Sequence, residues 1–155
     1  MIKEDFEKIK YSEQFKAIVT GSYLVSCFLN DASDLWEYNF YSRETKNIYT
    51  FILDNNEIKL KDTNILLNEK ENPEELFLGE LKLNEKEAVA VLNYFLLRMY
   101  KDHKVSKVIL SIEKNETIVW SIIVILKNLK VINIKINDKT SEIIEDKLIS
   151  PFSNS

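Results

Sequence analysis

Hydrophobic residues near the start of the chain recur at helical spacing, with charged residues between them. The positions that can share one helical face are Phe6, Ile9, Phe15, Ile18 and Val19. This pattern predicts an amphipathic helix from about Glu4 to Val19, because apolar residues three and four apart lie on the same side of a helix. Thr20-Gly21-Ser22 ends it.

Three apolar runs rich in β-branched and aromatic residues follow the predicted helix. They cover Tyr23 to Leu29, Leu35 to Tyr41 and Ile48 to Leu53, and polar segments separate them. Such runs predict three consecutive antiparallel strands. Asp54-Asn55-Asn56 has turn chemistry, and Glu57 to Lys61 extends the predicted meander briefly after it.

Two segments in the middle of the chain have the composition of a helix start. Asn72-Pro73-Glu74-Glu75 offers a capping asparagine, a proline suited to the first turn and acids at the positive end, and Gly79 ends this predicted helix. Asn84-Glu85-Lys86-Glu87 opens a longer helix, in which Glu87 completes a capping box. The apolar face of this second helix comprises Val89, Leu92, Phe95, Leu96 and Met99.

The pattern after that helix again predicts three strands. The runs are Val105 to Ile112, Thr117 to Leu126 and Val131 to Ile136, and in the last of them isoleucine alternates with asparagine or lysine. Alternation of this kind is typical of a sheet with one covered face and one solvated face. Glu142 to Ile149 adds a short terminal extension.

The order helix, strand, strand, strand thus occurs twice, and Trp36 and Trp120 begin the corresponding middle strands. We therefore expect an α+β fold of two αβββ-type repeats, produced by internal duplication, each with a helix packed on an antiparallel meander sheet. The expected divisions are residues 1–63 for the first repeat, 64–82 for a connector with a short helix, 83–150 for the second repeat and 151–155 for a frayed tail.

The second predicted repeat carries the features of a known family. Its helix opens with Asn84-Glu85-Lys86-Glu87-Ala88, its meander contains Val119-Trp120-Ser121-Ile122, and Ile134 to Ile144 reads as a strand, an acidic turn and a Thr-Ser-Glu ending. From Leu83 to Ile144 the chain resembles a PepSY or PepSY-like domain, with Ser141 at the usual glycine position. The segment from Asp5 to Lys61 is similar to that family only in the order of its elements.

The resemblance implies a small helix-on-sheet module without catalytic residues. The family is associated with peptidase propeptides, is often found outside the cytoplasmic membrane, and is proposed to bind or restrain partner proteins. On this basis we expect an inhibitory or binding role for the chain.

Composition excludes several classes of function. The 155 residues carry 21 basic and 25 acidic side chains, and the resulting net charge of −4 disfavours a nucleic-acid-binding surface. The two glycines, Gly21 and Gly79, are too far apart for a phosphate-binding loop. One cysteine, Cys27, and one histidine, His103, provide neither an internal disulfide nor a zinc site.

The sequence also predicts a cytoplasmic location without membrane association. Acidic residues stand where a signal peptide needs basic ones, in Met1 to Phe6, and the most apolar run, Ile118 to Leu126, is about half the length of a membrane-spanning helix. The β-branched residues of this run favour a buried strand.

Three candidate sites have chemistry worth weighing, and in each the structural interpretation is favoured. Asp102-His103 suggests a proton-transfer pair, but the basic residues around it suit a solvated helix end; these are Arg98, Lys101, His103, Lys104 and Lys107. Cys27 lies among apolar neighbours that favour a core thiol. The acidic pairs Asp31 with Asp34 and Glu69 with Glu71 could bind a hard cation but lack the ordered spacing of a calcium loop, so we interpret them as surface loops.

Aromatic side chains occupy both faces of one predicted strand. They are Trp36, Tyr38, Phe40 and Tyr41. We expect them to fill the helix-sheet interface, with Tyr41 or a neighbour available to a partner as the alternative.

Catalytic, cofactor-binding and metal-binding residues are therefore not predicted. The expected function is non-catalytic recognition of another protein or peptide, through an exposed strand edge or through an apolar surface between the halves. The alternative is an acidic secretion chaperone or a toxin-neutralising (immunity) protein. The sequence leaves the identity of the partner and the oligomeric state open.

Overall fold

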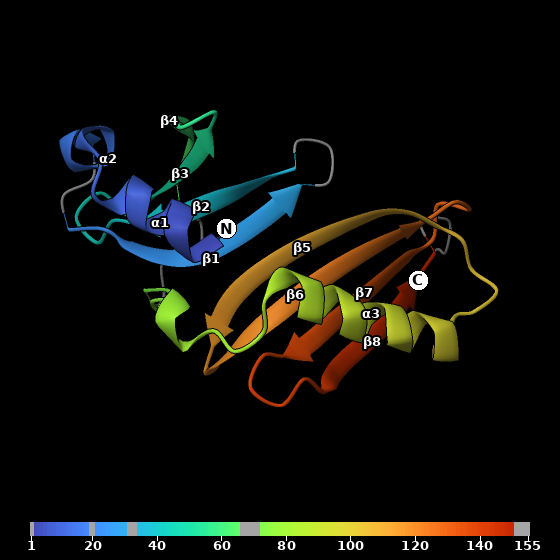
Figure 1. Cartoon of the computed structure of the whole chain (residues 1–155). Helices are drawn as coiled ribbons and strands as arrows, with labels where there is room; N and C mark the ends of the chain where they lie inside the picture. Colours follow the sequence, from blue (N-terminus) through green and yellow to red (C-terminus); the bar gives the residue numbers. More distant parts are fainter. Residues whose placement is uncertain (1, 19–20, 31–33, 66–71, 151–155) are drawn as a thin grey trace. The chain divides into compact units, whose positions relative to one another are not determined.

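The computed structural model describes residues 2–18, 21–30, 34–65 and 72–150 (Figure 1). The chain divides into two compact units, Met1–Gly79 and Glu80–Ser155. Each unit contains a four-stranded antiparallel meander, with strand order β4-β3-β2-β1 in the first and β5-β6-β7-β8 in the second.

The first unit begins with two short helices, α1 (Ile2–Lys10) and α2 (Glu13–Ile18). Ser12 separates them, because its hydroxyl donates to the Ile9 carbonyl at 2.6 Å and accepts from the Phe15 amide at 3.1 Å. A serine that bonds to the backbone in this way ends one helix and caps the next. The prediction of a single helix from Glu4 to Val19 is therefore wrong, and Val19 lies outside the described residues.

The predicted strands of the first half are confirmed. They form β1 (Tyr23–Asn30), β2 (Leu35–Tyr41) and β3 (Asn47–Asp54). The brief extension predicted after them is a full strand, β4 (Glu57–Ile65), joined to β3 by a two-residue hairpin. Asn55 and Asn56 both adopt positive φ, at 51° and 63°, which suits such a hairpin because asparagine tolerates the left-handed region.

Aromatic side chains fill the space between the two helices and this sheet. Phe15 of α2 contacts the rings of Phe40 and Phe51, at centroid distances of 4.7 and 5.4 Å. Phe6 of α1 stacks on Phe40, and the Tyr38 hydroxyl donates to the Ile2 carbonyl. The core of the unit is therefore a cluster of rings on one face of the sheet.

The helix predicted from Asn72 does not form. A helix capped by Asn72 would need the Leu76 amide to donate to the Asn72 carbonyl, but that amide donates to the Leu24 carbonyl at 2.8 Å. The Asn72 side chain accepts from the Tyr41 hydroxyl and so does not act as a cap. Only a 3-10 turn, η1 (Leu78–Glu80), follows.

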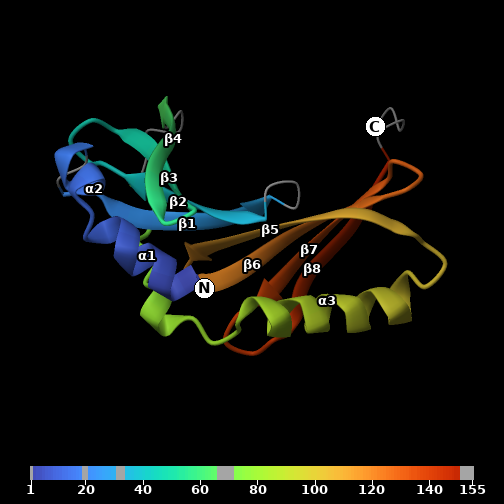
Figure 2. The same ribbon diagram turned by 45° about the horizontal axis from the view of Figure 1, so that its top comes forward.

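The second unit contains the long helix α3 (Glu85–Met99), whose capping box is confirmed. The Glu87 amide donates to Asn84 Oδ1 at 2.8 Å, and the Asn84 amide donates to Glu87 Oε1 at 3.1 Å. Figure 2 shows α3 running along one face of the sheet of this unit. Ala88 and Leu92 are buried there, whereas Met99, which was predicted on the apolar face, is exposed at the end of the helix.

The strands of the second unit agree closely with the pattern. They are β5 (Val105–Asn115), β6 (Thr117–Leu126), β7 (Val131–Asn137) and β8 (Ile143–Ile149). In β7 the isoleucines are buried and the residues between them are not, so the predicted alternation of a covered and a solvated face is confirmed. The terminal extension predicted from Glu142 is the fourth strand of the meander.

One buried carboxylate joins the helix and the sheet of this unit. Asp138, directly after β7, accepts from Trp120 Nε1 at 3.0 Å, from the Lys82 amide at 2.7 Å and from the Leu83 amide at 2.9 Å. Trp120 is fully buried. The chain entering α3 is therefore tied to β6 and to the end of β7.

The turn after Asp138 has a strained residue at its end. Ser141 adopts a φ of 63°, the conformation that glycine enters most readily, and its amide donates to the Asn137 carbonyl at 2.8 Å. The Asn137 side chain accepts from the Lys139 and Thr140 amides, which holds the turn together. Serine thus takes a conformation that glycine adopts more readily.

The predicted fold class of two αβββ-type repeats is wrong. The described chain is mostly antiparallel sheet, with eight strands and three α-helices. The units differ where the repeat required likeness, because two short helices precede the strands of the first and η1 with a single 15-residue helix precedes those of the second. Trp36 and Trp120 both lie near the start of a second strand, but Trp36 is only half-buried.

Replacing Trp120 should destabilise the protein strongly. We expect Trp120→Ala to lower the free energy of unfolding by about 3–5 kcal/mol, because it leaves a cavity and removes a donor from Asp138. Urea denaturation followed by circular dichroism measures this. Trp36→Ala is the matched control and should cost less, so equal losses for the two variants would contradict the assigned burial.

Replacing Ser141 with glycine should stabilise the turn. We expect Ser141→Gly to raise the free energy of unfolding by about 0.5–1 kcal/mol, because glycine adopts positive φ without strain. Ser106→Gly is the control, since Ser106 is an exposed strand residue where glycine weakens the strand. A thermal melt in which both variants are destabilised would disprove the argument.

Candidate functional site

A row of four polar side chains crosses the sheet of the first unit. Ser26, Asn39, Thr50 and Asp62 are cross-strand partners on β1, β2, β3 and β4, and we call them the polar row. Directly opposed residues in antiparallel strands project to the same face, and successive residues alternate between faces. Because Tyr38 and Phe40, on either side of Asn39, contact α1, the polar row faces away from the helices.

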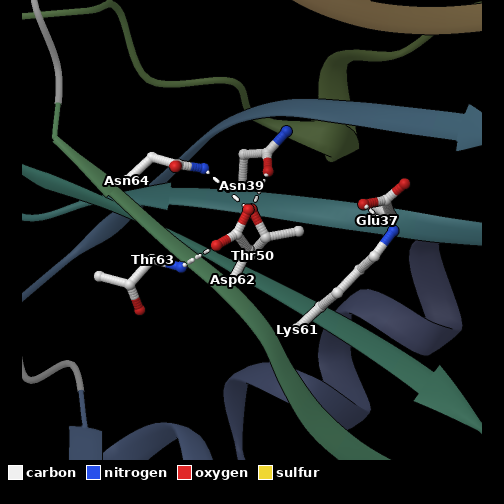
Figure 3. A network of polar contacts seen from close by, with 7 residues as sticks. All are labelled: Glu37, Asn39, Thr50, Lys61, Asp62, Thr63 and Asn64. Carbon is white, nitrogen blue, oxygen red and sulfur yellow. Dashed lines mark hydrogen bonds and ion pairs between the residues drawn. The ribbon is translucent and has the colours of Figure 1, made fainter.

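Hydrogen bonds run along the polar row in one direction, and Figure 3 shows the one between Thr50 and Asn39. The Thr50 hydroxyl donates to Asn39 Oδ1 at 2.6 Å, and Asn39 Nδ2 donates to Ser26 Oγ at 2.9 Å. Thr50 is buried and Asn39 and Ser26 are half-buried. The row therefore links three strands with side-chain bonds in addition to the backbone ladder.

The outer end of the polar row is charged. Asp62 accepts from the Thr63 amide at 2.8 Å and from Asn64 Nδ2 at 3.1 Å. Beside it, Lys61 Nζ lies 2.8 Å from Glu37 Oε1, and the Glu37 side chain is largely covered. Figure 3 shows this ion pair alongside the row.

This arrangement supports hydrogen bonding but not proton transfer. The hydroxyl of Thr50 points to a neutral carboxamide, which is not a base that could remove its proton. Among the described residues no group of three or more His, Cys, Asp or Glu side chains could hold a metal ion. Of the acids considered as cation ligands, Asp34 is an exposed residue with φ 54°, and Asp31, Glu69 and Glu71 lie outside the described residues.

The thiol of Cys27 is buried in β1, as predicted. Burial raises the pKa of Cys27 well above its usual range, so the thiol stays protonated and weakly nucleophilic. Its cross-strand partner is Tyr38. Burial, with smaller contributions from Cys27 and Asp5, also raises the pKa of Tyr38.

The region around His103 lies at the end of α3. The His103 amide donates to the Tyr100 carbonyl at 3.0 Å, and its ring lies 5.7 Å from the Tyr100 ring. The Tyr100 hydroxyl donates to Asp146 Oδ2 of β8 at 3.2 Å, and partial burial together with Asp146 raises the pKa of Tyr100. These contacts place the His103 imidazole in an edge-to-face contact with the Tyr100 ring, beside the end of α3.

Three of the four aromatic residues of β2 fill the interior, whereas Trp36 is half-buried. Tyr38, Phe40 and Tyr41 are all buried, and the Tyr41 hydroxyl donates to Asn72 Oδ1 at 2.9 Å. The alternative that Tyr41 is exposed to a partner is therefore wrong.

Exposed aliphatic side chains gather on β8 instead. The exposed fractions are 51% for Ile144, 41% for Leu148 and 38% for Ile149, and β8 ends the strand order of its unit. On β4, the terminal strand of the other unit, Leu60 is the comparable residue, at 39%. The sequence pattern of residues 142–149 predicts only a short extension, because nothing local in it indicates pairing with β7 on one side and an open edge on the other.

Comparison with known proteins supports the fold alone. The chain is similar to the crystal structure of a "putative lipoprotein" from Clostridium difficile 630, with a TM-score of 0.58, 15% sequence identity and 88% of each chain covered. No family model matches the chain, and no curated protein matches it. Within the described ranges, no helix is long and apolar enough to cross a membrane.

The polar row should contribute measurably to stability. We expect Thr50→Val to lower the free energy of unfolding by about 1–2 kcal/mol, because Asn39 Oδ1 loses its donor in a covered environment. Thr117→Val, at an exposed position of β6, is the control and should change it by no more than about 0.5 kcal/mol. Equal effects in chemical denaturation would show that the bond from Thr50 adds nothing.

Proposed function

We propose that this protein is a non-catalytic, PepSY-like polypeptide-binding or inhibitory module, and that a partner segment adds to its sheet as a strand along β8. The observation that carries the proposal is the exposure of Ile144, Leu148 and Ile149 on a terminal strand. A terminal strand offers backbone donors and acceptors to an incoming strand, and exposed side chains beside it supply specificity.

The polar chemistry of the chain also supports a binding role. The side chains of the polar row bond to one another, the Cys27 thiol is buried and protonated, and the Asp138 carboxylate is occupied by three donors. Groups used in this way are not available to activate a substrate. The aliphatic side chains of β8, in contrast, remain partly exposed on a terminal strand.

The proposal does not depend on the compartment in which the protein acts. The sequence predicts the cytoplasm, whereas the name of the structural neighbour refers to a lipoprotein. Cys27 itself is not a lipid attachment site in this fold, because its sulfur is buried in β1. Strand addition requires only that the β8 edge is accessible.

The test is loss of a partner when the β8 edge is altered. Affinity capture from native lysate with the wild-type chain should return a reproducible polypeptide partner, and Ile144→Lys with Leu148→Lys should reduce its recovery at least about tenfold, because lysine on an edge opposes strand addition. Leu60→Lys on β4 is the matched control, with similar exposure, and should retain the partner.

Two results would contradict strand addition at β8. One is a partner that the β8 variant retains as well as wild type does. The other is no reproducible partner together with a metabolite that stabilises the protein saturably, which would indicate a small-molecule role. Copurification of a dedicated basic protein independent of β8 would favour the chaperone or immunity alternative.

A further inference from the structure

The helix α3 has apolar residues on two opposite faces. Ala88 and Leu92 are buried against the sheet, whereas Tyr94 is 64% exposed and Leu97 is 71% exposed. Ala90, Tyr94 and Leu97 follow one another at spacings of four and three residues, which places them along one stripe of α3, and Lys101 follows just beyond the end of the helix. We call Ala90, Tyr94 and Leu97 the outer stripe.

An outer stripe of this kind departs from the usual pattern of a surface helix. A helix that covers a sheet needs one apolar face, and its outer face is normally charged or polar. The outer stripe instead presents an aromatic ring and a leucine to solvent, at the i, i+3 spacing by which a helix docks on another helix. The described contact of the Tyr94 ring is with Arg98, whose guanidinium carbon lies 5.6 Å from the ring centroid.

The exposed charges beside Tyr94 and Leu97, at the end of α3, are mostly basic. Arg98 and Lys101 are exposed, and Lys104 follows in the connection to β5. The acids of α3, Glu85 and Glu87, are in its first turn, where Glu87 is engaged in the capping box. Asp102 is the acidic residue within the basic end. This concentration of positive charge contrasts with the net charge of −4 for the whole chain.

We propose that the outer stripe binds an amphipathic helix of another polypeptide, with aspartate or glutamate flanking its apolar residues. Tyr94 and Leu97 are the apolar anchors, and Arg98 and Lys101 pair with the flanking acids. This inference rests on the proposed function as a polypeptide-binding protein, but it uses a surface separate from the β8 edge.

The charges also oppose a parallel arrangement of two copies of the chain. Two outer stripes packed in parallel would bring Arg98 and Lys101 of one copy close to the same residues of the other. Like charges at such an interface oppose association. A partner with acidic flanks relieves that repulsion and gains favourable pairing, which also makes its binding sensitive to salt.

The probes for the test are two synthetic helical peptides. Both have leucine at i, i+3, i+4 and i+7, and they differ only in whether the flanking positions are glutamate or lysine. Titration into the full chain, followed by fluorescence anisotropy, should show that the acidic peptide binds at least about tenfold more tightly. Its affinity should fall as salt is raised.

Variants of the chain locate the binding surface. Leu97→Glu should weaken the acidic peptide at least about tenfold, because it removes an anchor and adds a repelling charge. Leu129→Glu is the matched control, since Leu129 is 60% exposed on the turn after β6, and it should bind normally. The pair Arg98→Glu and Lys101→Glu should reverse the preference between the two peptides. Circular dichroism confirms that each variant is folded.

Several outcomes would overturn the inference. They are equal affinity for both peptides, no saturable binding up to about 1 mM, a Leu97→Glu variant that binds as wild type does, dimerisation of the chain through the outer stripe, or sedimentation with anionic phosphatidylglycerol vesicles in place of peptide binding. The β8 variant, Ile144→Lys with Leu148→Lys, should bind the acidic peptide normally. Failure at the outer stripe is therefore distinguishable from failure of strand addition at β8.

Discussion

The second unit depends on the hydrogen bonds that the Asp138 carboxylate accepts. A buried carboxylate is costly unless donors surround it, and Asp138 has three, from the Trp120 indole and the Lys82 and Leu83 amides. Those donors come from the middle of the sheet and from the chain that leads into α3. The Asp138 carboxylate thus fixes both the direction in which α3 begins and the position of the Trp120 side chain in the core. The tryptophan in turn fills the space between helix and sheet.

The first unit holds its helices against its sheet through different interactions. Its helices are short, and a cluster of rings from Phe6, Phe15, Phe40 and Phe51 covers one face of the sheet. The polar row stiffens the other face through hydrogen bonds between side chains. In both units, therefore, buried or half-buried polar side chains hold strands and helices in place through hydrogen bonds.

The surfaces proposed for recognition belong to one unit and are joined at one point. The Tyr100 hydroxyl, at the end of α3, donates to Asp146 in the middle of β8. The outer stripe and the β8 edge each present exposed apolar side chains. A partner with one extended and one helical segment could use both, and each contact would raise the effective concentration of the other.

Local signals in the sequence determined most of the strands and the best helix. Alternating isoleucines predicted β7, and Asn84 with Glu87 predicted the start of α3, because a capping box depends only on residues three apart. The apolar neighbours of Cys27 predicted that its thiol is buried.

The tertiary structure alone decided which distant groups the backbone amides and carbonyls bond to. The Leu76 amide bonds to Leu24 and so prevents the helix predicted from Asn72. The polar row exists because the register of four strands aligns Ser26, Asn39, Thr50 and Asp62. The exposure of Tyr94 and Leu97 likewise depends on which face of α3 the sheet covers, because both faces of that helix are apolar.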